Sequence, residues 1–351
     1  MCKLTCISKI SPVAVVVECY LEQSSSEGLQ PFPWIYPLLH LIVLVMEDDP
    51  EDILSTSFQS LYGVTPITFS STPGSVLTYS IKPPHPLAPE QIEVTTPDTD
   101  PSNWSLHASS IWVSSLFIAD HLDELQIDAM PARTGTVRVL ELGAGAGLPS
   151  ILLARTYEHA SVIASDYPDD RLIRTLSDNI RRNSVSERCR AVPCAWGVDS
   201  DARALIQHRD HSGTGTGSRS RGGRDHDDTR FDVVFAADTL WNPELHAPFL
   251  DTLCACLKRG ADSRIHLVAG LHTGRYTIQS FLDRTKLRKL VVLSATEREV
   301  DGTRSRPWDV SRAVGEDERE RRRWVVWMIL KWENSGDVLK PLGCALNGDS
   351  F

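Results

Sequence analysis

A glycine-rich turn carries the clearest chemical signal in this chain of 351 residues. Residues 139–149 read V-L-E-L-G-A-G-A-G-L-P, so Gly143, Gly145 and Gly147 alternate with alanines between an apolar run and a helix-like segment. Glycines let a ligand approach the backbone closely, and the free N–H groups at the start of a helix can bind polar ligand atoms. The pattern therefore predicts a turn that binds a small molecule.

Two ligand classes use such a turn. The dinucleotide-binding turn needs G-x-G-x-x-G/A, and Leu148 occupies the position of its last small residue. The alternative is the E/D-x-G-x-G-x-G turn of enzymes that use S-adenosylmethionine, and Glu141 stands two residues before Gly143. Asp166 ends the next apolar run and suits the ribose of either ligand, so Glu141 and Leu148 decide for S-adenosylmethionine. A glycine turn without any ligand is the structural alternative.

The segments around this turn alternate between short apolar runs and helical faces. This alternation predicts an α/β fold with a Rossmann-like parallel sheet and helices on both of its faces. We expect strands at 137–142, 161–165, 191–195, 231–236, 265–269, 290–294 and 324–332. We expect helices at 108–125, 148–157, 169–183, 244–258 and 276–288.

The composition excludes several classes of protein. Acidic residues outnumber basic ones by 46 to 36, which argues against a dedicated nucleic-acid binder. An apolar fraction of 41% suffices for a sizeable core. None of the eight cysteines forms a C-x-x-C pair, so no metal site is predicted, and the scattered thiols are typical of a cytoplasmic protein.

The regions outside the alternating pattern suggest the domain organisation. Residues 1–45 form an atypical extension whose apolar runs are shorter than the roughly 20 residues of a membrane span, so we expect no membrane anchor and a functional start at Met46. Within 46–103 we expect a β-hairpin over 67–81, around Pro73–Gly74, and then a loop over 83–103. The main domain, which holds the alternating strands and helices and the glycine turn, would span 104–335. It would contain a disordered insertion at 209–230 and precede a tail at 336–351.

The charged segment 297–323, which joins the last two expected strands, has two interpretations. It could be a solvated loop, or the basic run Arg321–Arg323 could contact an acidic partner.

From about residue 104 to 332 the sequence resembles the seven-β-strand methyltransferases of the family 16 lysine methyltransferase group. The likeness is greatest to the fungal branch, which includes proteins labelled nicotinamide N-methyltransferases and enzymes that methylate the N-terminus and adjacent lysine of translation elongation factor one-alpha. The matching segments are Trp112, E-L-G-A-G-A-G-L-P-S at 141–150, S-D-Y-P-D at 165–169, A-W-G at 195–197 and A-A-D-T-L-W-N at 236–242. The resemblance implies a seven-stranded sheet with an antiparallel last strand.

The resemblance also implies a pocket for S-adenosylmethionine. Gly143, Ala144 and Gly145 would pass under its methionine part, and Asp166 would hold the ribose. The other implied cofactor contacts are Glu141 and Gly147 in the turn, Trp196 beside the adenine, the backbone of Ala237, and Trp112 closing the site.

Three residues after the fourth strand are the implied catalytic group: Asp238, Trp241 and Asn242. The family more often has Phe or Tyr at the position of Trp241, which leaves the width of the acceptor channel open. His246 could also face the acceptor or be a plain helix residue.

These observations predict a cytoplasmic, monomeric N-methyltransferase that acts on a protein lysine or N-terminal amine, with a substrate resembling a translation elongation factor. The acceptor nitrogen must be neutral and held close to the methyl group, so positioning would supply most of the rate acceleration. A small-molecule N-methyltransferase of the nicotinamide type is one alternative. A cofactor-binding interaction protein without turnover is the other.

Overall fold

The computed structural model describes residues 3–11, 14–22, 67–70, 72–81, 91–130, 135–207 and 229–333. The chain divides into two compact units, Met1–Ile53 and Leu54–Phe351. In the first unit, β1 (Lys3–Ser11) and β2 (Ala14–Glu22) pair as an antiparallel hairpin. Most of the expected insertion 209–230, the whole tail 336–351 and residues 23–45 of the extension, with the start expected at Met46, lie outside the described residues.

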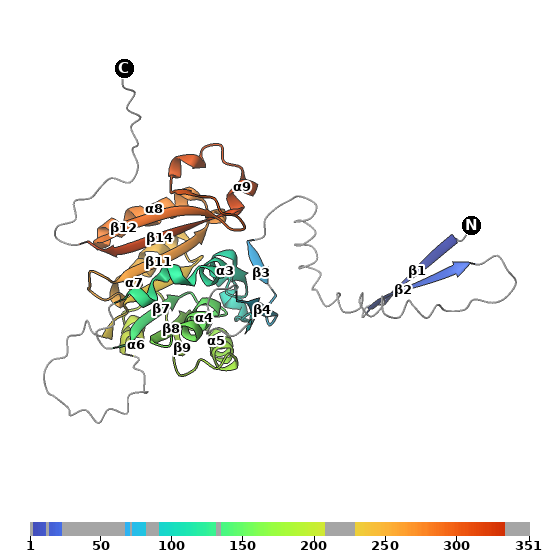
Figure 1. Ribbon diagram of the computed structural model, residues 1–351, viewed down its shortest axis with the longest axis horizontal. Helices are drawn as coiled ribbons and strands as arrows, with labels where there is room; N and C mark the ends of the chain where they lie inside the picture. The colour runs from blue at the N-terminus through green and yellow to red at the C-terminus, as the bar shows by residue number, and fades with distance from the viewer. Residues whose placement is uncertain are drawn as a thin grey trace, which may run out of the picture. The chain divides into compact units, whose positions relative to one another are not determined.

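A single sheet of eight strands organises the second unit (Figure 1). Its spatial order is β13-β12-β14-β11-β10-β7-β8-β9. The bounds are β7 (Val137–Leu142), β8 (Ala160–Asp166), β9 (Cys189–Pro193), β10 (Val233–Ala237), β11 (Arg264–Gly270), β12 (Leu290–Glu299), β13 (Ser305–Pro307) and β14 (Trp324–Trp332). The Rossmann-like α/β prediction is confirmed, and β13 is a short additional edge strand. As expected, β14 runs antiparallel to both of its long neighbours, β11 and β12.

Helices cover both faces of the sheet, as the alternating pattern of the strands requires. Val139 of β7 packs into one core with α3 and α4, and Leu140 packs into the opposite core with α7 and α8, because successive side chains of a strand point to opposite faces. The helices are α3 (Val113–Asp120), α4 (Leu148–Thr156), α5 (Asp170–Arg182), α6 (Asp199–Gln207), α7 (His246–Cys256), α8 (Arg275–Thr285) and α9 (Glu318–Arg322). Among them, α6 and the short α9 were not expected from the sequence.

The hairpin expected over 67–81 does not form. Instead β3 (Thr68–Ser70) pairs with β6 (Ile111–Trp112), and β4 (Val76–Ser80) pairs with β5 (Gln91–Thr95). The loop expected over 83–103 is therefore wrong at β5 and at the 3₁₀ helix η1 (Pro101–Leu106). Contacts between segments far apart in the sequence therefore decide which strands pair in this region.

A side chain of α5 fixes β5 in place. The amide oxygen of Asn179 accepts a hydrogen bond from the Thr95 N–H at 2.9 Å, and its nitrogen donates to the Thr95 carbonyl at 2.8 Å. On the inner face of β5, Ile92 and Val94 are fully buried in the core that contains α4. These contacts bring residues 96–110 across the end of the sheet.

None of the helices in the described part of the chain is both long and apolar enough to cross a membrane.

The charged segment 297–323 folds around a buried carboxylate rather than forming a solvated loop. Glu297 of β12 accepts hydrogen bonds from the guanidinium groups of Arg275 (3.0 Å), Arg306 (2.7 Å) and Arg312 (2.8 Å). Burial alone would raise the pKa of Glu297, but the bonds from Arg275 and Arg306 hold it below its usual value. In the basic run, Arg322 and Arg323 are already paired with glutamates of the same segment.

We predict that Glu297→Gln destabilises the protein by about 3 kcal/mol, because it leaves the buried Arg275 with an incomplete counter-charge. The lowered pKa means that the carboxylate stabilises the fold fully above the ordinary glutamate pKa of about 4.3, and that this contribution is lost on further acidification. Urea unfolding at neutral pH and at about pH 3.5 measures both effects. Glu318→Gln, which removes the exposed pair with Arg322, should cost less than about 1 kcal/mol. Equal losses in the two variants would contradict the prediction.

Candidate functional site

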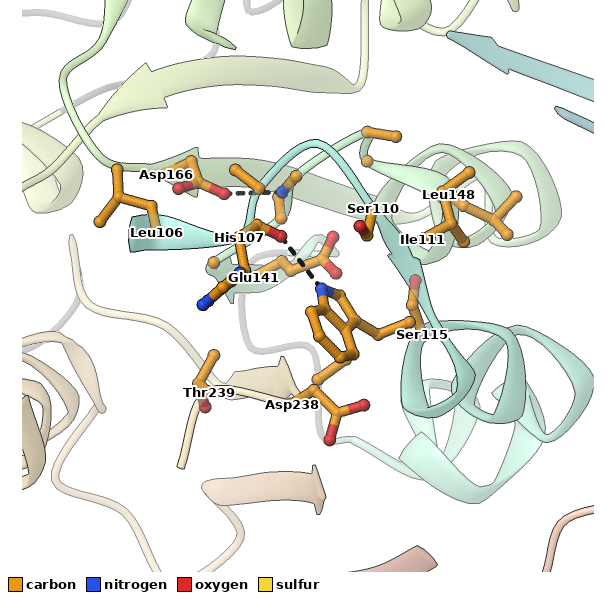
Figure 2. A pocket seen from close by; sticks show the side chains of 18 of the residues that line it. Leu106, His107, Ser110, Ile111, Ser115, Glu141, Leu148, Asp166, Asp238 and Thr239 are labelled. Carbon is orange, nitrogen blue, oxygen red and sulfur yellow. Dashed lines mark hydrogen bonds between the residues drawn. The ribbon is translucent and has the colours of Figure 1, made fainter. Parts of the chain in front are cut away.

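One cavity opens at the carboxyl ends of β7, β8 and β10, the edge where α/β sheets place their ligands (Figure 2). It contains about 650 Å³ of empty space, including the part that is open to solvent. Eleven of the twelve residues predicted for the site line it, and Asn242 does not. The eleven are Trp112, Glu141, Gly143, Ala144, Gly145, Gly147, Asp166, Trp196, Ala237, Asp238 and Trp241.

The glycine turn forms the floor of this cavity, and its glycines are required by geometry. Gly143, Gly145 and Gly147 all have positive φ angles, of 73°, 52° and 82°, a region that favours glycine. A Cβ atom on Gly143 would lie 2.9 Å from the Thr239 methyl carbon, and one on Gly147 would lie 2.4 Å from a methyl group of Leu176. The turn therefore exposes bare backbone to any molecule in the cavity.

Two acidic side chains lie beside the turn, and both are buried. Burial raises the pKa of Glu141 to about 8 against the opposing hydrogen bonds from Ser150, so the carboxyl group keeps its proton near neutral pH. Burial also raises the pKa of Asp166, although its oxygens accept hydrogen bonds from the Gly145 N–H (2.6 Å) and the Tyr167 N–H (2.7 Å). A carboxylate has about four lone-pair sites, so Asp166 can accept further bonds from ligand hydroxyls.

An apolar wall faces the turn. The indole of Trp196 packs on Phe249 with the ring centroids 4.6 Å apart, and its Cζ2 atom lies 3.5 Å from the position of a Cβ on Gly143. Ala237 and Thr239 also line the cavity, and the Thr239 methyl carbon lies 2.9 Å from the position of a Cβ on Gly143. Together these groups offer a surface suited to a flat aromatic ring.

A strap at residues 100–110 closes the other side of the cavity, and sequence reasoning missed it. Leu106, His107, Ala108 and Ser110 line the cavity from this strap. Asp169 anchors it, because its carboxylate accepts hydrogen bonds from the Asp100 N–H (2.9 Å) and the Asn103 side chain (2.8 Å). Asp100 caps η1, with Pro101 in the first turn. This Asp-Pro pair is the one sequence signal that could have revealed the helix.

The strap and the neighbouring strands bring three aromatic rings together at the mouth of the cavity. The Trp112 indole donates a hydrogen bond to the His107 carbonyl at 3.1 Å. The His107 ring makes edge contacts with Trp112 and with Trp241, at centroid distances of 6.2 and 5.1 Å. On its other side Trp112 stacks on His272, with 13° between the ring planes. The sequence predicted both tryptophans but neither histidine.

Asp238 lines the cavity, and its carboxylate accepts hydrogen bonds from the backbone N–H groups of Gly270 (2.6 Å) and Ser114 (3.4 Å). Its implied catalytic role stays a prediction. In Figure 2 the carboxylate points away from Glu141 and Asp166. Asp238 therefore joins the end of β10 to the end of β11 and the start of α3.

The side chains of Asn242 and His246 bind backbone groups close to them in the sequence. The Asn242 side chain accepts a hydrogen bond from the Glu244 N–H at 3.0 Å and caps the 3₁₀ helix η5 (Pro243–Leu245). The ring of His246 is buried, and its Nε2 lies 2.9 Å from the Leu240 carbonyl oxygen. The structure brings neither side chain to the cavity.

A search of the described residues for three or more clustered histidine, cysteine, aspartate or glutamate side chains finds no group that could hold a metal ion.

Comparison with known proteins gives one family match. Residues 100–210 match the family described as lysine methyltransferase. The protein N-terminal and lysine N-methyltransferase efm7 of Schizosaccharomyces pombe is 28% identical over 167 residues, which cover 47% of this chain and 55% of that protein. The protein of the same name from Gibberella zeae is 30% identical over 165 residues, which cover 44% of this chain and 55% of its own.

The chain thus spans about half the length of these curated relatives. Among solved structures, the fibrillarin pre-rRNA processing protein of Methanococcus jannaschii is 12% identical with a TM-score of 0.37, over 57% of this chain and 68% of its own.

The geometry of Asp238 leads to a prediction about Asp238→Asn. Asn also tolerates the left-handed backbone at this position (φ 50°), but it replaces one acceptor oxygen with an NH₂ group, so one backbone N–H loses its partner. We expect a loss of about 1–3 kcal/mol in unfolding free energy. Amide hydrogen exchange should also become faster at Gly270 or Ser114.

Asp283→Asn is the matched control, because this exposed carboxylate pairs loosely with Lys286 and accepts one hydrogen bond from the Gln279 side chain, but binds no backbone N–H group within the described ranges. It should leave the stability and the exchange at both amides unchanged. Unchanged stability and exchange in Asp238→Asn would show that the carboxylate does not hold these elements together.

Proposed function

We propose that this chain, whose residues 100–210 match the lysine methyltransferase family, is an S-adenosylmethionine-dependent N-methyltransferase. The observation that carries the proposal is the cavity, in which a bare glycine turn, a carboxylate at a strand end and an indole wall face one another. S-adenosylmethionine has three parts that match these features: an amino-acid chain, a ribose and a flat purine.

The residues of the cavity fit this cofactor in kind. A Cβ on Gly143 would crowd the Thr239 methyl group and the Trp196 ring, which both line the cavity, so glycine at this position leaves that space to a ligand. Asp166 has acceptor capacity left for ribose hydroxyls, and Trp196 offers an apolar face to the adenine. When bound, S-adenosylmethionine supplies an electrophilic methyl group on a positively charged sulfur.

The acceptor that we propose is an amine on a protein, either a lysine side chain or a free N-terminus. The names of the two fungal relatives support this class. The cavity also opens to solvent beside Trp241 and the exposed His107, so a side chain or chain end could enter from outside. As the specific substrate we propose a translation elongation factor, which would place the protein in the cytoplasm as a monomeric enzyme.

The chain's own contribution to the reaction is positioning and exclusion of water. The indoles of Trp112 and Trp241 flank the mouth and would surround the acceptor amine with apolar surface. Burial of this kind disfavours the charged ammonium form and so favours the neutral nitrogen that can react. Well-aligned reacting groups gain of the order of 7–11 kcal/mol relative to free reactants in solution.

We predict that Gly145→Arg abolishes binding of S-adenosylhomocysteine, measured by calorimetric titration. Gly145 has a φ of 52° at the cavity floor, and a Cβ there would point toward the strap, 3.7 Å from the Ala108 carbonyl oxygen. A long charged side chain would occupy the space assigned to the cofactor.

Gly135→Arg controls for backbone strain. Gly135 also has a positive φ, of 80°, but nothing lies within 4 Å of its Cβ position. It precedes the amino end of β7, whereas the cavity lies at the carboxyl end of that strand. The Gly135→Arg variant should therefore bind S-adenosylhomocysteine like the wild type. Equal affinity in the wild type and both variants would refute the assignment of this cavity.

The acceptor class can be tested with labelled S-adenosylmethionine and two fractions of a fungal extract, one of soluble protein and one of small molecules. We expect label in the protein fraction, and purified unmethylated elongation factor one-alpha should gain mass in steps of one methyl group. Label in the small-molecule fraction would favour a nicotinamide-type enzyme instead. Cofactor binding with no label in either fraction would favour an interaction protein without turnover.

A further inference from the structure

We propose that His107 accepts the proton that the substrate amine must lose before methyl transfer. This inference rests on the proposed function and adds a catalytic residue to it. The need arises from the acceptor itself, because a lysine ammonium has an ordinary pKa near 10.4 and only about one molecule in a few thousand is neutral at pH 7.

Four titratable side chains line the cavity, namely Glu141, Asp166, Asp238 and His107. Each carboxyl group already serves the fold. Glu141 is bonded to Ser150 and Asp166 to two backbone N–H groups. Asp238 holds Gly270 and Ser114.

His107 differs from these three. Among the residues that the structure describes, none forms a hydrogen bond with its ring nitrogens, and its ring makes only the edge contacts with Trp112 and Trp241. Imidazole is also the side chain whose ordinary pKa suits proton exchange near neutral pH. His272 lies behind Trp112 and does not line the cavity.

The backbone around His107 holds the ring at this place. His107 has a φ of 53° because it is the C-cap residue of η1, where its N–H donates a hydrogen bond to the Trp104 carbonyl oxygen at 3.0 Å. Its carbonyl oxygen is fixed by the Trp112 indole, and Asp169 anchors the start of the strap. The two flanking indoles have no proton-accepting nitrogen, so they can shape the channel but cannot replace the histidine.

The proton transfer balances as follows. One N–H bond of the substrate ammonium breaks, and the proton moves to a ring nitrogen of His107. The freed lone pair forms the new N–CH₃ bond while the bond between methyl carbon and sulfur breaks, with its electrons remaining on sulfur. Because His107 is exposed to solvent, its imidazolium can then release the proton to water.

The test compares wild type with His107→Phe and His107→Gln, using soluble fungal protein, heated to inactivate its own enzymes, as the methyl acceptor. Phe keeps an aromatic ring between the indoles, and Gln keeps a polar group. At about pH 7 we expect both variants to be about a hundredfold slower, within the usual range for general base catalysis. Toward about pH 9.5 the difference should shrink to a few-fold, because solvent then deprotonates the amine.

His159→Gln makes the same chemical change outside the cavity. His159 pairs with Asp128 at the amino edge of the sheet, so its variant should keep wild-type rates at every pH. Calorimetry should show that all three variants bind S-adenosylhomocysteine within about twofold of the wild type, since removal of a base does not alter uniform binding.

A second readout does not depend on turnover. In the complex with S-adenosylhomocysteine, the ring nitrogens of His107, identified by their absence from the His107→Phe spectrum, should titrate by NMR with a midpoint at the inflection of the wild-type rate profile. A rate ratio that stays constant with pH, or a ring that does not titrate between about pH 5 and 9, would overturn the role of His107 alone. Absence of any methyl transfer by the wild type would overturn the proposed function together with it.

Discussion

The carboxylate of Asp238 connects the parts of the site to the sheet. Asp238 follows β10 with a left-handed backbone conformation, and its carboxylate accepts hydrogen bonds from Gly270 at the end of β11 and from Ser114 at the start of α3. The ends of two strands and the start of a helix, from distant parts of the sequence, therefore meet at one buried side chain. Trp112 is the N-cap residue of α3, so the position of its indole at the cavity depends on this junction.

The junction at Asp238 also positions the aromatic rings at the opening of the cavity. A Cβ on Gly270 would lie 2.3 Å from the His272 ring, so any side chain there would displace that ring from its present position. His272 then folds back and stacks on Trp112, which in turn holds the His107 carbonyl. A chain of contacts thus leads from the sheet edge to the strap.

The sequence predicted the sheet well because its signals are local. The bounds of β7 and β14 agree with the expected 137–142 and 324–332, since both strands are mostly apolar, interrupted only by Arg138 and Glu141 in β7 and by Lys331 in β14. The glycine turn was equally readable, because positive φ angles at a strand–helix junction demand glycine. The expected hairpin over 67–81 failed for a different reason. The partners of β3 and β4 lie at 111–112 and 91–95, and local patterning does not specify which strand a given strand will pair with.

The site residues show the same difference between local signals and long-range contacts. Residues attached to the sheet edge, such as Glu141, Asp166 and Trp241, could be placed from motif and topology. The direction of the Asp238 carboxylate could not, because it depends on two backbone N–H groups that come from elsewhere in the chain.

Burial also divides the titratable groups of the site by role. The carboxyl groups of Glu141 and Asp166 lie where desolvation raises their pKa values, and hydrogen bonds from the glycine turn and its flanking residues compensate them there. Such groups hold structure well, but proton exchange with water would require those bonds to rearrange. An imidazole on an exposed strap has the opposite properties, since it can reach both the cavity and the solvent. The arrangement thus separates the buried carboxyl groups that build the cavity from the exposed imidazole of His107.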